Sequence, residues 1–339
     1  MKALVTQFIA SIEHTGAWAP WIFLALFIAA SLLMIWRLEA MNGDGFEGTV
    51  LGTLVMPYCS GIPNLVFAFL RGMNHGRGEE VMTNALVNNI TNMTLLIGLP
   101  AVIWGMNVMG KPAKKPGVKG GKSGGNKAGQ INRLSLLLTL TAVLFFTGAT
   151  WALARDGKLD FSDGLVLVGL FLFWQCFHVF DVLKANVQKG RSFNSMLPVN
   201  LALLAVGAFA IYLSIDWLIK WSNSKTGFVH DHLGWLSGLL MVLPNGILAL
   251  YYGWRGKPEV IYSSQVGDGH ICIPLCIGIY ALYHPMTMPT VFQTGVIILG
   301  AATALHFVVV AVFGGLPRLA GIGLVVAFFV FLLKGLLKT

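Results

Sequence analysis

Long, uninterrupted apolar runs are the feature that most constrains how this chain can fold. A helix needs about 20 mostly apolar residues to cross the roughly 30 Å hydrocarbon layer of a bilayer. The 339 residues contain ten such stretches, at 18–36, 48–70, 79–104, 133–153, 163–183, 194–219, 233–254, 258–282, 289–313 and 316–337. The runs are continuous rather than alternating, which argues against a β-barrel. The sequence therefore predicts an all-α polytopic membrane protein with ten transmembrane helices.

The composition excludes the main soluble classes. Apolar residues make up 56% of the chain and charged residues only 11%, whereas about 25% of a soluble domain is charged. One soluble core cannot absorb this much apolar surface, so a soluble enzyme and a disordered chain are both excluded. The four cysteines lie inside apolar segments and form no recognisable disulfide framework. The first apolar run lacks a cleavage site and is expected to be a retained helix.

The positive charge is interpreted as a topology signal. The net charge is +9, and seven of the 23 basic residues lie between Lys111 and Arg133. The stretch 110–132, rich in Gly and Lys, is expected to be a flexible solvent loop. Ten helices place both termini on one side, with nine basic residues there and fourteen opposite. Positive-inside then predicts both termini outside a plasma (bacterial inner) membrane. The expected partners are the lipid bilayer and small inorganic cations, with no nucleic acid.

Two segments resemble each other and indicate an internal repeat. Pro63-Asn64 and Pro244-Asn245 each lie within an apolar helix, and about fifteen residues later an acid, Glu79 or Glu259, begins another. An odd number of helices per copy makes the copies antiparallel, as in many secondary transporters. We expect two inverted five-helix repeats, residues 1–183 and 184–339, with the loop 110–132 inside the first. Prolines and glycines in the two Pro-Asn helices predict helix breaks there.

The helices that follow carry polar stripes. Asn84, Asn88 and Asn92 recur every four residues, and so do Ser264, Asp268, Cys272 and Cys276. Residues at this spacing share one helix face. Unsatisfied polar groups are costly in hydrocarbon, by several kcal/mol each. These faces are therefore expected to point at protein, water or a ligand.

This order of Pro-Asn helix, short loop and polar-striped helix resembles the sodium/calcium exchanger family of cation/Ca²⁺ antiporters. The resemblance implies ten helices in two inverted halves. Each half carries a Gly-Thr-Ser-x-Pro-Glu signature followed by Gly-Ser-Asn-x-x-Asn or Asp. It also implies alternating access, with the first and sixth helices sliding over the others.

Several signature positions differ in this chain. Asn64 and Asn245 stand where the family has its glutamate ligands, and Cys272 replaces the acid that ends the second signature. Asp268 falls where the family has Ser, and Ser60 aligns with its Thr. Ca²⁺ takes six to eight oxygen ligands, several of them carboxylates. A centre with one acid favours a monovalent cation, or a proton on Asp268, over a divalent ion.

The candidate residues follow from these positions. The predicted cation-binding residues are Asn64, Asn88, Asn92, Asn245, Asp268, Cys272 and Ser60, and Glu79 and Glu259 are candidates for ion entry. Interhelical hydrogen bonding is the alternative for the asparagines, whereas an acid within a membrane is a functional hypothesis by default. His270, with neighbouring cysteines, is a weaker candidate ligand for a transition metal.

The predicted function is secondary active cation transport of the exchanger type. Enzymatic activity is not expected, because the sequence contains no convincing catalytic motif. Monovalent- or proton-coupled exchange is favoured. No cofactor is expected beyond the transported cation, such as Na⁺, H⁺ or Ca²⁺. Three alternatives stay open: a non-transporting protein with the exchanger fold, a Ca²⁺ or transition-metal antiporter, and an intramembrane enzyme that uses His270 and Asp268.

Overall fold

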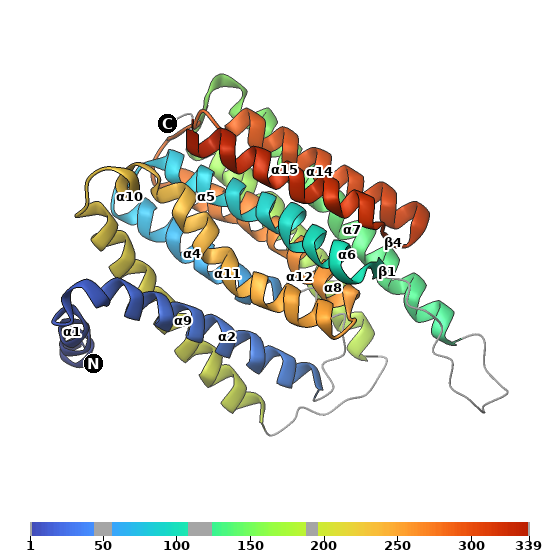
Figure 1. Ribbon diagram of the computed structural model, residues 1–339, viewed down its shortest axis with the longest axis horizontal. Helices are drawn as coiled ribbons and strands as arrows, with labels where there is room; N and C mark the ends of the chain where they lie inside the picture. Colours follow the sequence, from blue (N-terminus) through green and yellow to red (C-terminus); the bar gives the residue numbers. More distant parts are fainter. Residues whose placement is uncertain (1, 44–55, 108–123, 188–195, 338–339) are drawn as a thin grey trace.

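The chain forms a bundle of long helices (Figure 1). The computed structural model describes residues 2–43, 56–107, 124–187 and 196–337. The first half contains α1 (Lys2–Glu13), the 3₁₀ turn Gly16–Trp18, α2 (Ala19–Gly43), α4 (Met56–Met73), α5 (Gly78–Thr91), the π-helical segment η3 (Asn92–Leu96), α6 (Ile97–Trp104), β1 (Met106–Asn107), α7 (Gly124–Leu153), a 3₁₀ turn at Ala154–Asp156, β2 (Lys158–Leu159) and α8 (Phe161–Val187).

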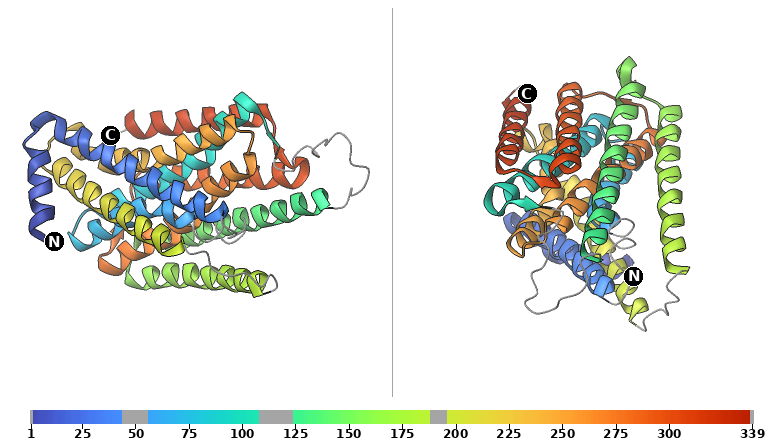
Figure 2. Two further views of the ribbon diagram at one scale, coloured as in Figure 1. Left: turned by 90° about the horizontal axis from the view of Figure 1, so that it is seen from below. Right: turned by 90° about the vertical axis from the view of Figure 1, so that its right-hand side faces the viewer.

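The second half also consists mainly of long helices, with two short strands. It contains α9 (Leu197–Asn223), α10 (Phe228–Asp231), α11 (Leu233–Trp254), α12 (Pro258–Ile271), the π-helical segment η5 (Cys272–Cys276), α13 (Ile277–Tyr283), β3 (Met286–Thr287), α14 (Phe292–Phe313), β4 (Gly315–Leu316) and α15 (Arg318–Leu337). Figure 2 shows α1 at a steep angle to the long helices, at the end of the bundle where α15 also finishes. The sequence did not predict α1.

Eight helical stretches among the described residues are long and apolar enough to cross a membrane. They are Gly16–Arg37, Gly78–Trp104, Arg133–Asp156, Pro198–Asn223, Leu233–Trp254, Pro258–Tyr283, Phe292–Phe313 and Arg318–Leu336. Each coincides with one of the predicted spans. The two other predicted spans, 48–70 and 163–183, fall on α4 and α8. The described part of α4 begins only at Met56, and the apolar part of α8 is Phe161–Phe177.

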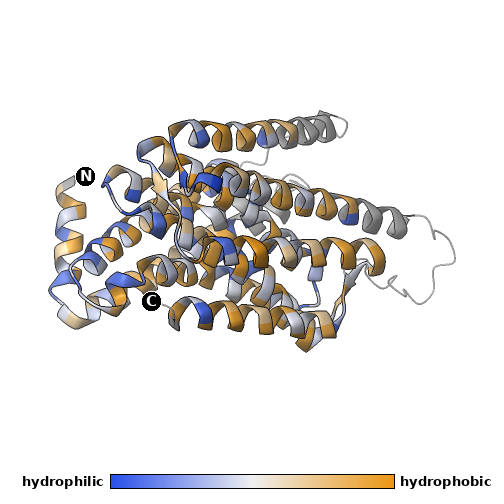
Figure 3. Cartoon of the chain, turned by 90° about the horizontal axis from the view of Figure 1, so that it is seen from above, coloured by the Kyte–Doolittle hydropathy of each residue, from blue (hydrophilic) through white to orange (hydrophobic). Residues whose placement is uncertain are grey.

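The outer surface of the bundle suits a bilayer. Large apolar side chains point outward from several helices, among them Phe173 of α8, Val312 of α14 and Leu319 of α15. Figure 3 shows hydrophobic residues along the length of the long helices and hydrophilic residues at many of the turns. A soluble protein rarely exposes apolar patches on this scale. The chain is an integral, multi-pass membrane protein.

Two expectations about local structure are wrong. α4 and α11 continue through Pro63 and Pro244, where breaks were predicted. A proline removes only one backbone hydrogen bond, and close neighbours can satisfy the freed carbonyl inside a membrane bundle. The predicted loop 110–132 is also too long, because α7 begins at Gly124. Residues 108–123 lie outside the described residues.

The departures from α-helical geometry occur instead in the two polar-striped helices. α5 and α12 have 14 residues each, and each leads directly into a five-residue π-helical segment. Asn92 is the first residue of η3 and Cys272 the first residue of η5. π-Helical insertions of this kind are rare and occur mostly at functional sites. They direct attention to the helix interior around these two residues.

Contacts between the two halves occur in crosswise pairs. β1 pairs antiparallel with β4, and β2 pairs antiparallel with β3. Glycines make two similar contacts: a Cβ on Gly98 of α6 would lie 2.9 Å from the Gly321 carbonyl of α15, and one on Gly164 of α8 would lie 2.9 Å from the Gly278 carbonyl of α13. β1 and α6, which follow η3, thus contact β4 and α15 at the end of the second half. In the same way β3 and α13, which follow η5, contact β2 and α8 at the end of the first half.

α2 and α9 pack together beside the rest of the bundle (Figure 1). Phe23 of α2 stacks on Trp217 of α9, with ring centroids 4.3 Å apart. Phe23 also belongs to a small apolar cluster with Ile12 and Ala19, separate from the main core. These two helices correspond to the predicted first and sixth spans.

Candidate functional site

A chain of hydrogen bonds joins buried amides to a buried carboxylate inside the bundle. Asp268 of α12 is fully buried, and its Oδ2 accepts hydrogen bonds from Asn245 Nδ2 at 2.5 Å and Asn92 Nδ2 at 2.9 Å. Asn92 Nδ2 also donates to Asn88 Oδ1 at 2.9 Å, and Asn88 Nδ2 donates to Asn64 Oδ1 at 3.1 Å. We call these five residues the amide–carboxylate network. They are five of the seven predicted cation-binding residues.

The network contains oxygen acceptors that receive no hydrogen bond. Among the described residues, no donor reaches Asn92 Oδ1 or Asn245 Oδ1. Gln265, one turn before Asp268, adds a third such oxygen: its Nε2 donates to Asn245 O at 3.4 Å, while its Oε1 has no donor in the described part of the chain. A buried acceptor left unsatisfied costs about 1–3 kcal/mol. Amide oxygens without a donor are groups that can act as cation ligands.

Close helix packing brings the network together. Asn64 comes from α4, Asn92 from η3 at the end of α5, and Asn245 from α11. α11 approaches α5 closely because glycines face it: a Cβ on Gly238 would lie 2.8 Å from Val87 Cβ and 2.9 Å from the Asn84 carbonyl oxygen. A larger residue would push α11, and Asn245 with it, away from Asp268.

The two remaining predicted ligands are Cys272 and Ser60. Cys272 is fully buried at the start of η5, within hydrogen-bonding reach of the Cys276 and Asn89 side chains. Ser60 falls on α4, but its side chain lies outside the described residues. Sequence reasoning missed Gln265, although a glutamine in a membrane helix at the spacing i−3 from Asp268 was a usable signal.

His270 faces away from the amide–carboxylate network. Its side chain is buried, and its ring lies 6.3 Å from the ring of Trp174 in α8, measured between centroids. Over the described ranges, no three side chains of His, Cys, Asp or Glu gather in a way that could hold a metal ion. The cysteines considered as its partners are Cys59, Cys272 and Cys276, and the side chain of Cys59 lies outside the described residues.

A buried ion pair lies at the start of α5. Glu80 Oε2 pairs with Arg71, and Glu80 Oε1 accepts from Arg77 Nε at 2.8 Å. Arg71 and Glu80 are both buried, whereas Glu79 and Glu259, the predicted entry residues, are exposed at the first turns of α5 and α12. The helix dipole favours carboxylates at these positions. Glu80 precedes Asn84 by the same four-residue spacing that separates the asparagines of the stripe.

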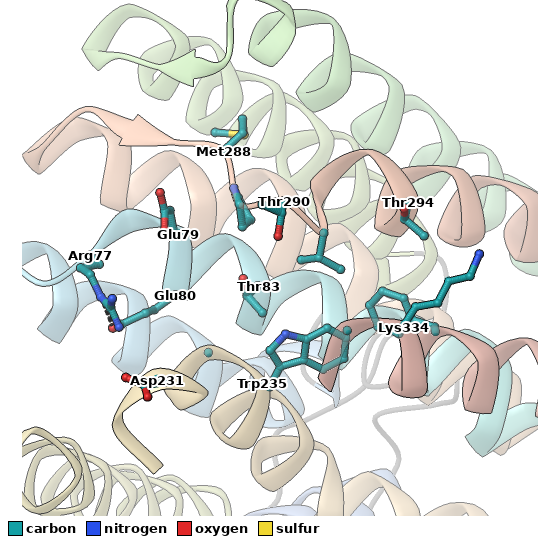
Figure 4. A pocket seen from close by; sticks show the side chains of 15 residues that line it. Arg77, Glu79, Glu80, Thr83, Asp231, Trp235, Met288, Thr290, Thr294 and Lys334 are labelled. Carbon is teal, nitrogen blue, oxygen red and sulfur yellow. Dashed lines mark hydrogen bonds and ion pairs between the residues drawn. The ribbon is translucent and has the colours of Figure 1, made fainter. Parts of the chain in front are cut away.

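A cavity of about 500 Å³ opens beside this ion pair, at the end of the bundle where α15 finishes. Figure 4 shows Arg77, Glu79 and Glu80 toward one end of the cavity and Lys334 toward the other. Thr83 and Trp235 also line it. Glu79 Oε1 accepts a hydrogen bond from Thr287 Oγ1 at 3.0 Å. The predicted entry residue Glu79 is thus part of a polar cavity.

Buried polar residues lead from this cavity toward Asp268. Asn84 lies one turn below Glu80 and donates through Nδ2 to Ser237 Oγ of α11 at 3.0 Å. Asn88 follows after another turn, and Asn92 after a third. One turn of α-helix rises about 5.4 Å. The face Glu80–Asn84–Asn88–Asn92 therefore forms a line of polar side chains through the core, and we call it the polar line of α5.

Comparison with known proteins agrees with this architecture. Residues 15–180 match the model of the family described as sodium/calcium exchanger protein. The fold is similar to solved structures of the sodium-calcium exchanger NCX_Mj. With the structure soaked with 2.5 mM Na⁺ and 10 mM Sr²⁺, the TM-score is 0.63 at 18% identity, over 91% of this chain and 95% of that chain. Residues 15–180 belong to the sodium/calcium exchanger family.

Two further NCX_Mj structures give similar values. The structure soaked with zero Na⁺ and Ca²⁺ has a TM-score of 0.63 at 18% identity, over 92% of this chain and 96% of that chain. The structure soaked with 10 mM Na⁺ and zero Ca²⁺ has a TM-score of 0.61 at 18% identity, over 91% and 95%. The exchanger-type fold thus extends over nearly the whole chain, well beyond the residues matched by the family model.

Most of the polar groups in the amide–carboxylate network are neutral. Asn64 and Asn245 occupy the Pro-Asn positions, and both lie in the amide–carboxylate network. Within that network, Asp268 is the acid, and the other four side chains are neutral amides. When Asp268 is ionised, the five residues together carry one negative charge.

Proposed function

We propose that this chain is a secondary active cation transporter that works by alternating access, with monovalent- or proton-coupled exchange. The observation that carries the proposal is the buried Asp268 carboxylate, which accepts hydrogen bonds from the amides of Asn92 and Asn245 at 2.9 Å and 2.5 Å. Buried acids in membrane proteins mark ion and proton pathways because their desolvation is costly. The proposed ligands are the network residues and Gln265, with Ser60 and Cys272 nearby in sequence.

Charge decides which ion the site prefers. A monovalent cation or a proton neutralises the single carboxylate, whereas a divalent cation leaves an uncompensated positive charge away from water. Buried charges are tolerated when they are paired and hydrogen-bonded. Ca²⁺ binding usually recruits several carboxylates. The proposed exchanger therefore handles Na⁺ or H⁺ in preference to Ca²⁺.

The asparagine amides can donate hydrogen bonds when the site is empty and offer oxygen ligands when a cation is bound. In the structure, Asn92 and Asn245 turn their NH₂ groups toward Asp268. The terminal torsion of an asparagine is broad and roughly two-fold. Rotating each amide would aim its oxygen at a bound cation, or at a proton carried by Asp268. The unsatisfied oxygens Asn92 Oδ1 and Asn245 Oδ1 support this proposed exchange of roles.

We also propose ten transmembrane helices in two inverted repeats, residues 1–183 and 184–339. Support comes from the crosswise contacts: β1–β4 mirrors β3–β2, and Gly98–Gly321 mirrors Gly278–Gly164. A two-fold axis in the membrane plane would produce such exchanged pairs. The matching positions of η3 and η5 add to the argument.

The proposed path for the cation follows the polar line of α5. The cavity that contains Glu79 is the proposed entrance at the end where both termini lie, and Glu259 stands at the start of α12, the corresponding position in the other repeat. α2 and α9 are the pair proposed to slide over the core and expose the site to each side in turn. Both termini are proposed to lie outside.

Ion flux in proteoliposomes tests the proposal directly. Gradients of Na⁺, H⁺ and Ca²⁺ would be imposed in turn on the wild-type chain and on Asp268→Asn. We expect flux driven by Na⁺ or H⁺, and its loss in the variant because the charge at the site is gone. Asp216→Asn is a matched control, since Asp216 forms a peripheral pair with Lys220. Folded wild-type protein without flux under any gradient would refute transport.

A further inference from the structure

A buried histidine contacts the backbone directly beside the amide–carboxylate network. His306 of α14 is fully buried, and its Nε2 lies 2.7 Å from the Met93 carbonyl oxygen. Its Nδ1 lies 3.3 Å from the hydroxyl of Tyr262 in α12, which is also fully buried. The two rings meet edge to face, at an interplanar angle of 89°. Neither residue belongs to the network described above.

The hydrogen-bond partners define the roles of the two ring nitrogens. A carbonyl oxygen can only accept, so Nε2 carries the hydrogen and donates to Met93 O. In the neutral ring, Nδ1 is then an acceptor, and the Tyr262 hydroxyl donates to it. Both nitrogens of His306 are therefore used, and Tyr262 holds the ring in place.

The π-helical segment changes the hydrogen bonding around Met93 O. In an unbroken α-helix, the Ile97 N–H would donate to Met93 O, four residues earlier. Here the Ile97 N–H donates to Thr94 O instead. A buried carbonyl without a partner is costly in a membrane interior. The imidazole of His306 gives Met93 O a hydrogen bond in place of the one that the Ile97 N–H would have made.

Met93 directly follows Asn92, whose amide links Asn88 to Asp268. We propose that His306 is a positioning residue for the cation site: its hydrogen bond fixes the π-helical turn that aims the Asn92 amide at Asp268, and Tyr262 orients the His306 ring. The inference rests on the proposed cation site. It assigns a role in that site to α14, a helix that contributes no residue to the network.

The test compares a variant without the donor with one that keeps it. His306→Leu has a similar volume but no N–H, whereas His306→Gln retains an amide N–H. The readout is the Na⁺ concentration that gives half of the Na⁺-dependent rise in melting temperature, with choline replacing Na⁺ at constant ionic strength. We expect an increase of about tenfold or more in His306→Leu, as for other partners that orient ligands. We expect His306→Gln to stay within a few-fold of wild type, and Tyr262→Phe to fall between the two.

A matched control separates positioning from general stability. Thr303 lies one turn earlier in α14 and is fully buried, and its hydroxyl donates to Leu299 O of the same helix at 2.7 Å. Thr303→Val removes a buried hydroxyl without touching Met93, so its half-saturating Na⁺ concentration should equal that of wild type. A merely structural role for His306 would lower the melting temperature in zero Na⁺ but leave that concentration unchanged.

A second measurement does not require ion binding. Amide hydrogen exchange over residues 92–98 should rise in His306→Leu and Tyr262→Phe but not in Thr303→Val. Unchanged exchange there, or an equal loss of Na⁺ affinity in His306→Gln and His306→Leu, would overturn the inference. In a further outcome, wild type shows no response to Na⁺, H⁺ or Ca²⁺ while amide hydrogen exchange still rises in His306→Leu. That result would refute the proposed transport but support the role of His306 in fixing the π-helical turn.

Discussion

At the scale of single residues, the balance of charge around Asp268 is the property that sets the chemistry. Asn245 Nδ2 lies 2.5 Å from the Asp268 carboxylate. Asn245→Asp would place a second acid there with almost no change in volume. Two unit charges about 4 Å apart interact by about 4 kcal/mol at an effective dielectric constant of 20. A divalent cation would relieve this repulsion and would gain affinity.

The prediction is that Ca²⁺ inhibits Na⁺-driven flux of Asn245→Asp at a concentration at least about tenfold lower than for wild type, a difference of about 1.4 kcal/mol. Flux would be measured in proteoliposomes over a Ca²⁺ series. Asn223→Asp, on an exposed residue at the end of α9, is the control and should behave like wild type. An equal Ca²⁺ sensitivity in all three proteins would contradict the monovalent preference derived from charge.

The buried ion pair at the start of α5 makes a separate prediction about stability. Glu80→Gln leaves the buried Arg71 guanidinium without its carboxylate partner. Breaking one side of a buried pair typically destabilises a protein by about 3–5 kcal/mol. Arg77→Ala removes the other cation, whose side chain is 55% exposed, and should change stability by about 1 kcal/mol or less. Unfolding in detergent would rank the two, and a larger effect of Arg77→Ala would contradict this assignment.

At the scale of helices, the approach of α11 to α5 depends on glycine. A Cβ at Gly238 would lie 2.8 Å from Val87 Cβ, too close for an undisturbed interface. Gly238→Ala should destabilise the protein by about 1–3 kcal/mol and reduce flux, because Asn245 moves with α11. At Gly300 of α14, a Cβ would meet nothing within 4 Å. Gly300→Ala should be neutral or stabilising by up to about 1 kcal/mol. Thermal melts and flux of the two variants provide the comparison.

Hydropathy predicted most of the helices because the bilayer itself imposes their length and apolarity. The eight membrane-length stretches all fall on predicted spans. Hydropathy could not locate the irregular turns. Pro63 and Pro244 lie in continuous helices, whereas η3 contains no proline. The side chain that contacts η3 at Met93 O is His306, which is separated from Met93 by 213 residues, so local sequence patterns could not reveal the contact.

For the candidate site, the sequence predicted which helix face is buried but not the hydrogen-bond partners of its residues. The four-residue spacing of Asn84, Asn88 and Asn92 indicated a face turned toward protein, and all three are buried. Spacing alone could not distinguish their partners: Asn84 bonds Ser237 across to α11, whereas Asn92 bonds Asp268. Those contacts depend on how α4, α11 and α12 pack. Whether the residues bind a cation stays a prediction.

At the scale of the whole molecule, the ends of the helices define two faces. Lys334 of α15 lines the same cavity as Arg77 and Asp231, and Trp217 near the end of α9 donates to Glu13 of α1 at 2.9 Å. Both terminal helices and the α9–α10 turn therefore lie at one end of the bundle. α11 begins at this end and finishes at the other, where Gly253 approaches Trp104 of α6. Ser224 and Arg255, both exposed, mark opposite faces.

The positive-inside rule assigns these faces to the two sides of the membrane, with Ser224 outside and Arg255 inside. A membrane-impermeant maleimide should therefore label Ser224→Cys in intact cells, and label Arg255→Cys only after the membrane is permeabilised. The parent chain, whose cysteines lie in apolar segments, sets the background. The reverse pattern would invert the proposed orientation and place the Glu79 cavity inside. Labelling of both variants in intact cells would contradict opposite faces altogether, because α11 would then not cross the bilayer.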